Sequence, residues 1–337
     1  MTDAKLFNRD AFKRLLSSNP AIAAHIVKKI WTGDTGENNA VAATSDGLYV
    51  YLALGISPAK IKKIDTATLE TVATWTGAAG EDYPMAICFA GGLLFLMTDT
   101  SPGQVIKIDP ETMATLDKWV GPAGSNYAYS MTADGSYIYA GLYIDPGQVV
   151  KIDPATMETV ATWTGAAGEN KVRALTYDGD YIYAGLWITT TKVIKINKAT
   201  MTTVSSWTGA AGENYCNSLA FDGTFVYAGL SISPSKVKKI KPSDMSLIST
   251  WTGAAGQNTL TNILFDSENI YATFQLSPFQ LVKIDRSAMT TISTLTGASG
   301  ENNGLALTFD GNFVWIGLLT SPAKLIRRIV RDIDETQ

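Results

Sequence analysis

The tripeptide Trp-Thr-Gly, or a close variant of it, returns every 44 residues, and this period constrains the fold more than any other feature. The first residues of the seven copies are Trp31, Trp75, Trp119, Trp163, Trp207, Trp251 and Leu295. No insertion or deletion interrupts the spacing after the first copy. A fixed repeat of about 40–45 residues is typical of β-propellers, in which each repeat forms one blade. The sequence therefore predicts an all-β, seven-bladed β-propeller.

Each repeat carries the pattern of four short strands. In the repeat that begins at Trp163, ALTYDG ends in an Asp-Gly turn, and DYIYAGL alternates as a strand does. KVIKIN and the β-branched segment TTVSSW supply the third and fourth strands. Seven four-stranded repeats predict 28 strands in one closed ring, because single blades cannot bury their faces alone.

The two ends of the chain complete the predicted ring. The last repeat stops after its third strand at residues 325–330, and residues 25–31 match the missing fourth strand. We therefore expect an N-terminal strand to close the final blade and remove the exposed sheet edges. Residues 1–20 form a separate amphipathic helix or arm before the propeller at 21–337. The apolar face of this helix, a predicted partner-docking surface, contains Leu6, Phe7, Leu15 and Leu16.

Charge and composition exclude several classes of function. The net charge is −4 and no basic patch is visible, so we expect no nucleic-acid partner. No apolar stretch is long enough for a transmembrane helix, and the first residues do not resemble a secretory signal. We therefore expect a protein that is cytoplasmic or assembled from the cytoplasm. Its two cysteines, Cys88 and Cys216, fall in different blades and are expected to be buried free thiols.

The repeat resembles the YVTN group of seven-bladed propellers, with a looser likeness to WD-repeat blades. The resemblance rests on KIDPATMETVATWTG at 151–165 and on LTYDGDYIYAG at 175–185, and it covers residues 31–337. The Gly-His and Trp-Asp dipeptides of WD repeats are missing, and Tyr-Ala-Gly-Leu stands in place of Tyr-Val-Thr-Asn. Propellers of this kind bind proteins, glycans or small molecules, and some are enzymes. The resemblance therefore implies a fold and not an activity.

Positions that are identical in the repeats are most simply explained by the shared architecture. The Trp that ends the fourth strand is expected to pack between blades, and stacking on sugars is the alternative. A basic residue recurs in the third strand, at Lys63, Lys107, Lys151, Lys195, Lys239, Lys283 and Arg327. These are either strand-face charges near turn carboxylates or a ring for an anionic partner. The GAAGEN loop supplies a carboxylate in most repeats, but without the spacing of a calcium loop, so we expect no metal and no cofactor.

Positions that differ between the repeats concentrate in the loops that follow GAAGEN and in those around Ser-Pro. In propellers of this type these two sets of loops share one face. Blades two to five carry Tyr, Trp, Lys and Arg there, and all but Lys are enriched at binding hot spots. The candidate ligand- or partner-binding residues are Tyr83, Tyr127, Tyr129, Lys171, Arg173, Tyr215, Asn217, Trp187, Asp99 and Asp145. The alternative is ordinary variation at loop ends.

These features favour a non-catalytic interaction or scaffold module that binds a protein or belongs to a larger assembly such as a virion. No catalytic triad or His/Cys metal set can be assembled, because the single histidine, His25, lies in the predicted outermost strand. The runner-up is a lectin-like glycan binder with several near-equivalent sites. A third reading is a small-molecule enzyme that uses Asp99 and Asp145 as a carboxylate pair on neighbouring loops.

Overall fold

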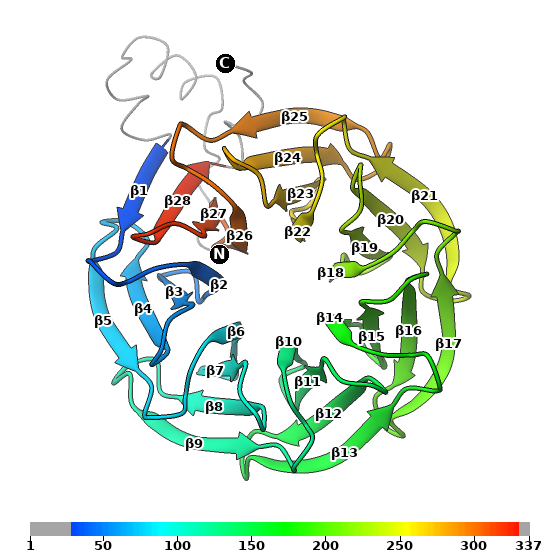
Figure 1. The fold of residues 1–337 in the computed structure, drawn as a ribbon, viewed down its shortest axis with the longest axis horizontal. Helices are drawn as coiled ribbons and strands as arrows, with labels where there is room; N and C mark the ends of the chain where they lie inside the picture. Colours follow the sequence, from blue (N-terminus) through cyan, green and yellow to red (C-terminus); the bar gives the residue numbers. More distant parts are fainter. Residues whose placement is uncertain (1–27, 330–337) are drawn as a thin grey trace, which may run out of the picture.

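The fold is a closed ring of seven β-sheets. The structure, a computed structural model, describes residues 28–329. Within that range it has 28 strands in seven four-stranded antiparallel sheets, which surround a central axis as the blades of a propeller (Figure 1). The seven-bladed β-propeller predicted from the repeat is therefore confirmed.

The strands of blades one to six run from the axis outward in chain order, and blade seven differs only in its outermost strand, β1. The innermost strands of blades one to seven are β2 (Ala40–Ser45), β6 (Pro84–Ala90), β10 (Ala128–Ala133), β14 (Val172–Tyr177), β18 (Cys216–Phe221), β22 (Leu260–Phe265) and β26 (Gly304–Phe309). The second strands are β3 (Tyr49–Leu54), β7 (Leu93–Thr98), β11 (Ile138–Leu142), β15 (Tyr181–Leu186), β19 (Val226–Leu230), β23 (Asn269–Phe274) and β27 (Phe313–Leu318).

The two outer strands of each blade complete the sheets. The third strands are β4 (Lys60–Asp65), β8 (Gln104–Ile108), β12 (Gln148–Asp153), β16 (Lys192–Asn197), β20 (Lys236–Lys241), β24 (Gln280–Asp285) and β28 (Lys324–Ile329). The outermost strands are β5 (Thr71–Thr76), β9 (Thr115–Val120), β13 (Glu158–Thr164), β17 (Thr202–Thr208), β21 (Ser246–Thr252), β25 (Thr291–Thr296) and, in blade seven, β1 (Lys28–Thr32).

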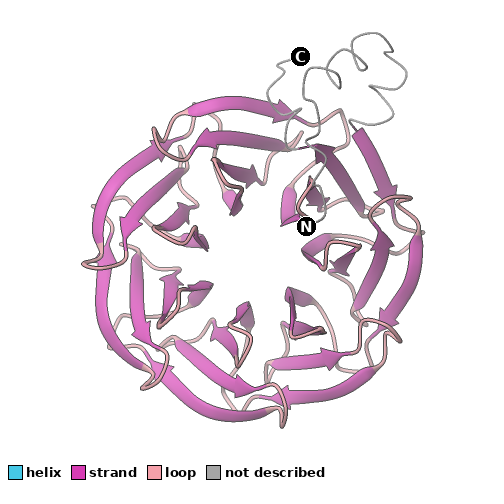
Figure 2. Cartoon of the chain, turned by 180° about the vertical axis from the view of Figure 1, so that it is seen from behind, coloured by secondary structure: helices cyan, strands magenta, loops and turns pink. Residues whose placement is uncertain are grey.

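Blade seven is built from both ends of the described chain. Strand β1 pairs antiparallel with β28, and Lys29 lies opposite Arg327. The predicted closure by an N-terminal strand is therefore confirmed. Figure 2 shows the ring from behind, and every element drawn within the described range is a strand. The helix expected over residues 1–20, with Leu6, Phe7, Leu15 and Leu16, lies outside the described residues, as does His25. None of the described elements is a helix able to cross a membrane.

The apolar core lies between neighbouring blades. One of its clusters joins Tyr139 and Trp163 of blade three to Val172 and Ile182 of blade four. The blades approach so closely that a Cβ atom at Gly185 would lie 2.5 Å from the Cys216 Sγ atom of the next blade. Cys216 is buried, and burial raises the pKa of its thiol to about 12. Both cysteines are free, as predicted, although Cys88 is only half-buried.

The repeated tryptophans join adjacent blades, which confirms their predicted structural role. The Trp163 Nε1–H group donates to the Thr203 Oγ1 atom of the next outermost strand at 2.9 Å, and Trp75 makes the same bond to Thr115. All six indoles are at least nine-tenths buried, so none of them can stack on a sugar from solvent. Leu247 occupies the corresponding acceptor position beside Trp207, and its side chain cannot accept this bond.

The substitution Leu247→Thr is expected to supply this missing bond. Leu247 lies half-exposed on β21, so little packing is lost, and a new inter-blade hydrogen bond should stabilise the ring by about 0.5–1.5 kcal/mol. Leu247→Val is the matched control, because valine is β-branched but carries no hydroxyl group. Urea unfolding of the two variants measures the difference. Equal stabilities would show that the hydroxyl group contributes nothing at this seam.

The invariant basic residues also connect neighbouring blades. Lys195 Nζ donates to the Pro242 carbonyl oxygen at 2.8 Å and lies 3.8 Å from the centroid of the Tyr181 ring. The bond to a carbonyl 47 residues further on recurs from Lys63, Lys107, Lys151 and Lys239. These residues are buried, except for Lys107, which is half-buried. They act between blades, and their acceptors are backbone carbonyls rather than the turn carboxylates expected from the sequence.

Candidate functional site

The candidate site is the loop face, the side of the ring formed by the loops from fourth to first strands and from second to third strands. Three repeated positions of each blade meet there. The first is the residue after the GAAGEN-type loop, whose φ angle is between 48° and 59° in all seven blades. These residues are Asn39, Tyr83, Tyr127, Lys171, Tyr215, Thr259 and Asn303. Left-handed backbone is uncommon for non-glycine residues, and its sevenfold recurrence makes it a property of the blade.

The second position follows two residues later and is a β-bulge in every innermost strand. In β14, for example, the register shifts between Val172 and Ala174, so Arg173 has no direct partner on β15. A bulge can re-aim a side chain out of the regular sheet pattern. The seven bulged residues, which we call the channel ring, are Val41, Met85, Tyr129, Arg173, Asn217, Thr261 and Leu305. All seven line a central cavity of about 230 Å³.

The third position is the residue that follows the second strand. Its backbone N–H group donates to the carbonyl oxygen of the left-handed residue in the same blade, as from Asp99 to Tyr83 and from Trp187 to Lys171, both at 2.9 Å. This bond holds the two loops together. The third-position residues are Gly55, Asp99, Tyr143, Trp187, Ser231, Gln275 and Leu319. Each blade therefore presents three variable side chains on an invariant backbone frame.

Arg173 is the centre of a contiguous cluster on this face. Its guanidinium carbon lies 4.4 Å from the centroid of the Tyr129 ring and 5.5 Å from that of Trp187. Its Nε–H group donates to Asn217 Oδ1 at 2.8 Å. The amide nitrogen of Asn217 in turn donates to the carbonyl oxygens of Leu260 and Thr261 at 2.8 and 3.2 Å. Burial lowers the pKa of Arg173, but arginine stays charged in proteins.

Asp99 lies beside this guanidinium group and is hydrogen-bonded to Tyr129. Burial raises the pKa of Asp99, and the hydrogen bond from Tyr129 and the charge of Arg173 only partly oppose it. The Asp99 Oδ1 atom is buried and has no hydrogen-bond partner among the described residues. Burial therefore disfavours the charged form of Asp99, and no Asp99 oxygen lies within 4.0 Å of an Arg173 nitrogen.

Aromatic side chains extend the cluster across blades three to five. The ring centroids of Tyr129 and Tyr143 are 4.8 Å apart, and those of the stacked pair Trp187 and Tyr215 are also 4.8 Å apart. The Lys171 Nζ atom lies 5.4 Å from the Tyr143 ring centroid. The Arg173 cluster, as we call it below, consists of Asp99, Tyr129, Tyr143, Lys171, Arg173, Trp187, Tyr215 and Asn217.

The structure brings most of the predicted site residues together, but not all. Tyr83 and Tyr127 flank the cluster as half-exposed side chains, 54% and 49% accessible. Asp145 is exposed, whereas the interactions of Asp99 are with Tyr129 and Arg173. Asp99 and Asp145, the expected carboxylate pair, therefore differ in their surroundings. The predicted set left out Tyr143, although its position in the repeat matches that of Trp187.

The loop carboxylates have a structural role. Glu169 Oε2 accepts the Ala166 N–H bond at 3.1 Å, and its Oε1 atom lies 3.0 Å from Lys192 Nζ. In blade six, Gln257 accepts the same backbone bond and donates to Gln280, which replaces the lysine. Six of the seven loops therefore use this side chain to close their own turn, and the exception is blade three, where Ser125 stands at this position and Pro122 has no N–H group to donate. Among residues 28–329, no group of three or more His, Cys, Asp or Glu side chains is placed to hold a metal ion.

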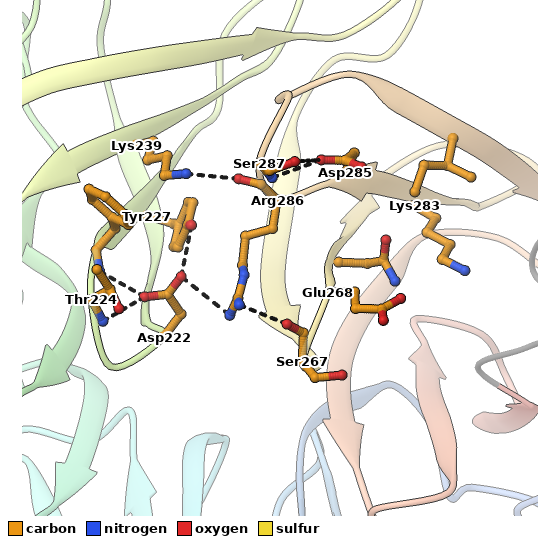
Figure 3. Close-up of a pocket in the computed structure, with 13 residues that line it drawn as sticks. Asp222, Thr224, Tyr227, Lys239, Ser267, Glu268, Lys283, Asp285, Arg286 and Ser287 are labelled. Carbon is orange, nitrogen blue, oxygen red and sulfur yellow. Dashed lines mark hydrogen bonds and ion pairs between the residues drawn. The ribbon is translucent and has the colours of Figure 1, made fainter.

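A second cavity, of about 590 Å³, lies between blades five and six on the opposite face (Figure 3). Arg286 crosses it: its Nη1 atom is 3.3 Å from Asp222 Oδ2, and its Nη2 donates to the Ser267 carbonyl oxygen at 2.7 Å. Lys239 donates to the Arg286 carbonyl oxygen at 2.9 Å. The main charges in this cavity bind one another and connect the two blades.

Comparisons with known proteins add no family to these observations. No model of a protein family matches the chain, and no curated protein matches it. The likeness to YVTN and WD-repeat blades therefore remains a likeness of repeat pattern, and the structure supports its fold part, a ring of seven four-stranded blades.

Proposed function

We propose that this chain is a non-catalytic interaction module that binds a protein partner through the loop face of blades two to five. The observation that carries the proposal is the Arg173 cluster. It places Tyr, Trp and Arg side chains in one contiguous, half-buried patch, and these residue types dominate binding hot spots. Blades six, seven and one have only Thr, Asn, Gln, Val, Leu and Gly at the same positions. The patch is thus asymmetric on a symmetric frame, as one docking site requires.

The size of the central cavity also favours a macromolecular partner. Small-molecule pockets usually enclose about 300–1,000 Å³, and the cavity at the channel ring is smaller, at about 230 Å³. A side chain or a chain end of a partner fits such a space, while the rest of the partner lies over the surrounding loops. Asp99 interacts with Tyr129 and Arg173 whereas Asp145 is exposed, so their surroundings give the enzyme reading no support.

The lectin reading loses its strongest feature in the structure. It needs near-equivalent exposed aromatic side chains in successive blades, but the repeated tryptophans are buried between blades. The exposed loop-face residues differ from blade to blade. The same proposal includes a structural role within a larger particle, with the N-terminal segment as a second contact. An interaction module and a structural component would both bind protein through the loop face.

The test is whether binding is lost when an exposed tyrosine beside the Arg173 cluster is replaced without changing the backbone conformation of its loop. The variant is Tyr127→Asn, because Asn39 and Asn303 occupy this left-handed position in blades one and seven. Proteins captured by the full chain from source cells are identified, purified and titrated against both forms. We expect Tyr127→Asn to weaken binding by about 30-fold or more, the effect of removing a hot-spot side chain.

The matched control is Tyr177→Ala. Tyr177 is an exposed aromatic residue at the other end of β14, and Ala133 occupies its position in blade three. An equal loss of binding in the control, or none in Tyr127→Asn, would place the partner away from the loop face. Binding to a glycan array, with affinity lost gradually as blades are altered one by one, would favour the lectin reading instead.

A further inference from the structure

Within the described chain, Arg173 is a half-buried cation without a carboxylate partner. Its Nε–H group donates to the neutral amide of Asn217, whereas its two terminal nitrogens bond no residue in 28–329 and are not among the buried atoms without a partner, so they are accessible to solvent. No carboxylate oxygen of those residues lies within 4.0 Å of it. Arginine is rarely buried without a paired charge, because desolvation of an unpaired cation is costly. The site is therefore electrostatically incomplete.

The surroundings hold this guanidinium group in one orientation. It lies over the Tyr129 ring and close to the Trp187 ring, and Asn217, itself fixed by two backbone carbonyls, fixes its Nε end. The terminal Nη1 and Nη2 groups remain as a pair of parallel donors. This geometry matches the two oxygens of a carboxylate, and little side-chain entropy is lost on binding because the fork is already ordered.

The cavity sets the size and shape of what can bind. Arg173 is the only charged residue among those that line it within the described range. Across the ring lie Val41, Met85 and Leu305, which give the opposite wall an apolar surface. An anion on a short hydrocarbon stem fits a space of about 230 Å³ with these two walls.

We propose that the channel ring is a receptor for a carboxylate of the protein partner, an Asp or Glu side chain or a C-terminus, whose oxygens pair with Arg173. This inference rests on the proposed function in so far as the carboxylate belongs to a protein. A free small carboxylate offers the same chemistry, and the experiment separates the two sources.

The first arm of the experiment uses butyrate, with butyramide as the neutral analogue of the same shape. The full chain is titrated with each, and the Arg173 Nε–H signal is followed by NMR, with Arg173→Gln used to assign it. We expect a saturable shift with butyrate and none with butyramide. No shift with either compound at concentrations that shift surface arginines, or equal shifts with both, would overturn the carboxylate site.

The second arm selects peptides that bind the full chain from a random library, as pools with free and with amidated C-termini. We expect the selected peptides to share an Asp, a Glu or a free C-terminus. Their affinity should fall by about 30-fold or more in Arg173→Gln, and less in Arg173→Lys, which keeps the charge without the fork. Asp99→Asn removes the acidic group nearest to Arg173, so its binding should become tighter. Tyr177→Ala, outside the cluster, is the control and should bind as the unchanged chain does.

The outcomes separate this inference from the proposed function. If the selected peptides share no carboxylate, or bind Arg173→Gln equally well, the loop face would still bind proteins, but the inference of a carboxylate receptor would be wrong. Saturation by butyrate without any peptide or protein ligand would overturn the proposed function and show that the site takes a free acid. Weaker binding in Asp99→Asn would point to a cationic ligand and contradict the inference. Thermal unfolding of each variant shows whether the ring is intact.

Discussion

Replacing Glu213 by glutamine is expected to destabilise the folded ring by about 3–5 kcal/mol at neutral pH. The Glu213 side chain is 9% exposed, and the Lys238 side chain beside it is 4% exposed. Glu213 Oε1 contacts both Lys238 and Lys236, and its Oε2 accepts the Ala210 N–H bond at 3.1 Å. Glutamine can keep the bond to Ala210, but it leaves the Lys238 ammonium group buried without a negative partner.

The effect of this substitution should depend on pH. Burial alone would raise the pKa of Glu213, but the hydrogen bonds from Lys238 and Lys236 outweigh it and lower the pKa from 4.5 to about 2. A carboxylate whose pKa is lowered by folding contributes stability above its unfolded pKa, and loses this contribution as the pH falls through its folded pKa. The stability difference between the two forms should therefore be largest at neutral pH and shrink between pH 4.5 and about 2. Urea unfolding at pH 7, 4 and 2.5 measures it.

Blade six supplies the matched control for this prediction. Gln257 and Val282 stand there at the positions of Glu213 and Lys238. The double substitution Glu213→Gln with Lys238→Val copies that pair, and it should recover most of the stability lost in Glu213→Gln, because no buried charge remains unpaired. A double variant as unstable as the single one would show that the loss does not come from Lys238.

The substitution Trp163→Ala should cost about 3–5 kcal/mol of stability, because it leaves a cavity at the seam of blades three and four. The indole is 2% exposed, packs with Tyr139 and Val172, and donates to Thr203. Trp163→Leu should cost less, since Leu295 occupies this position in blade six. Chemical unfolding of the purified variants measures the loss.

Val160→Ala on the same strand is the control for Trp163→Ala. Val160 is 50% exposed, and surface substitutions usually change stability by no more than about 0.5 kcal/mol. Similar losses in the two variants would mean that β13 is sensitive to any truncation and that the indole has no special role between the blades.

The ring could be predicted from the sequence because each blade repeats the same pattern of residue types every 44 residues. The 44-residue spacing, the alternation in segments such as DYIYAGL and the absent fourth strand of the last repeat depend only on residue types along the chain. The seams between blades were harder to predict. The acceptors there are backbone carbonyl oxygens, as in the bonds from Lys151 to Lys198, from Lys195 to Pro242 and from Lys239 to Arg286. Because any residue type has a backbone carbonyl group, the sequence does not mark these acceptors.

The candidate site was predicted as a list of variable residues, without its internal order. Nothing in the residue type of Tyr127 indicates a left-handed backbone, and nothing in that of Arg173 indicates a bulge. The blade imposes both conformations, and they decide that Tyr127 extends into solvent whereas Arg173 lines the central cavity. Asp145 was grouped with Asp99 because both lie in corresponding loops, but two residues of separation in the repeat place them in different surroundings.

Closure of blade seven by β1 has a consequence for the order in which the molecule is made. Lys29 pairs with Arg327, so β1 leaves the ribosome before the strands of all seven blades that follow it and finds its partner only after β28 has been synthesised. Until then the growing chain is an open arc with a free sheet edge at its newest blade, and free edges favour pairing between chains. Once β1 has paired with β28, no seam of the ring is left to fill, and the seven blades become one cooperative body.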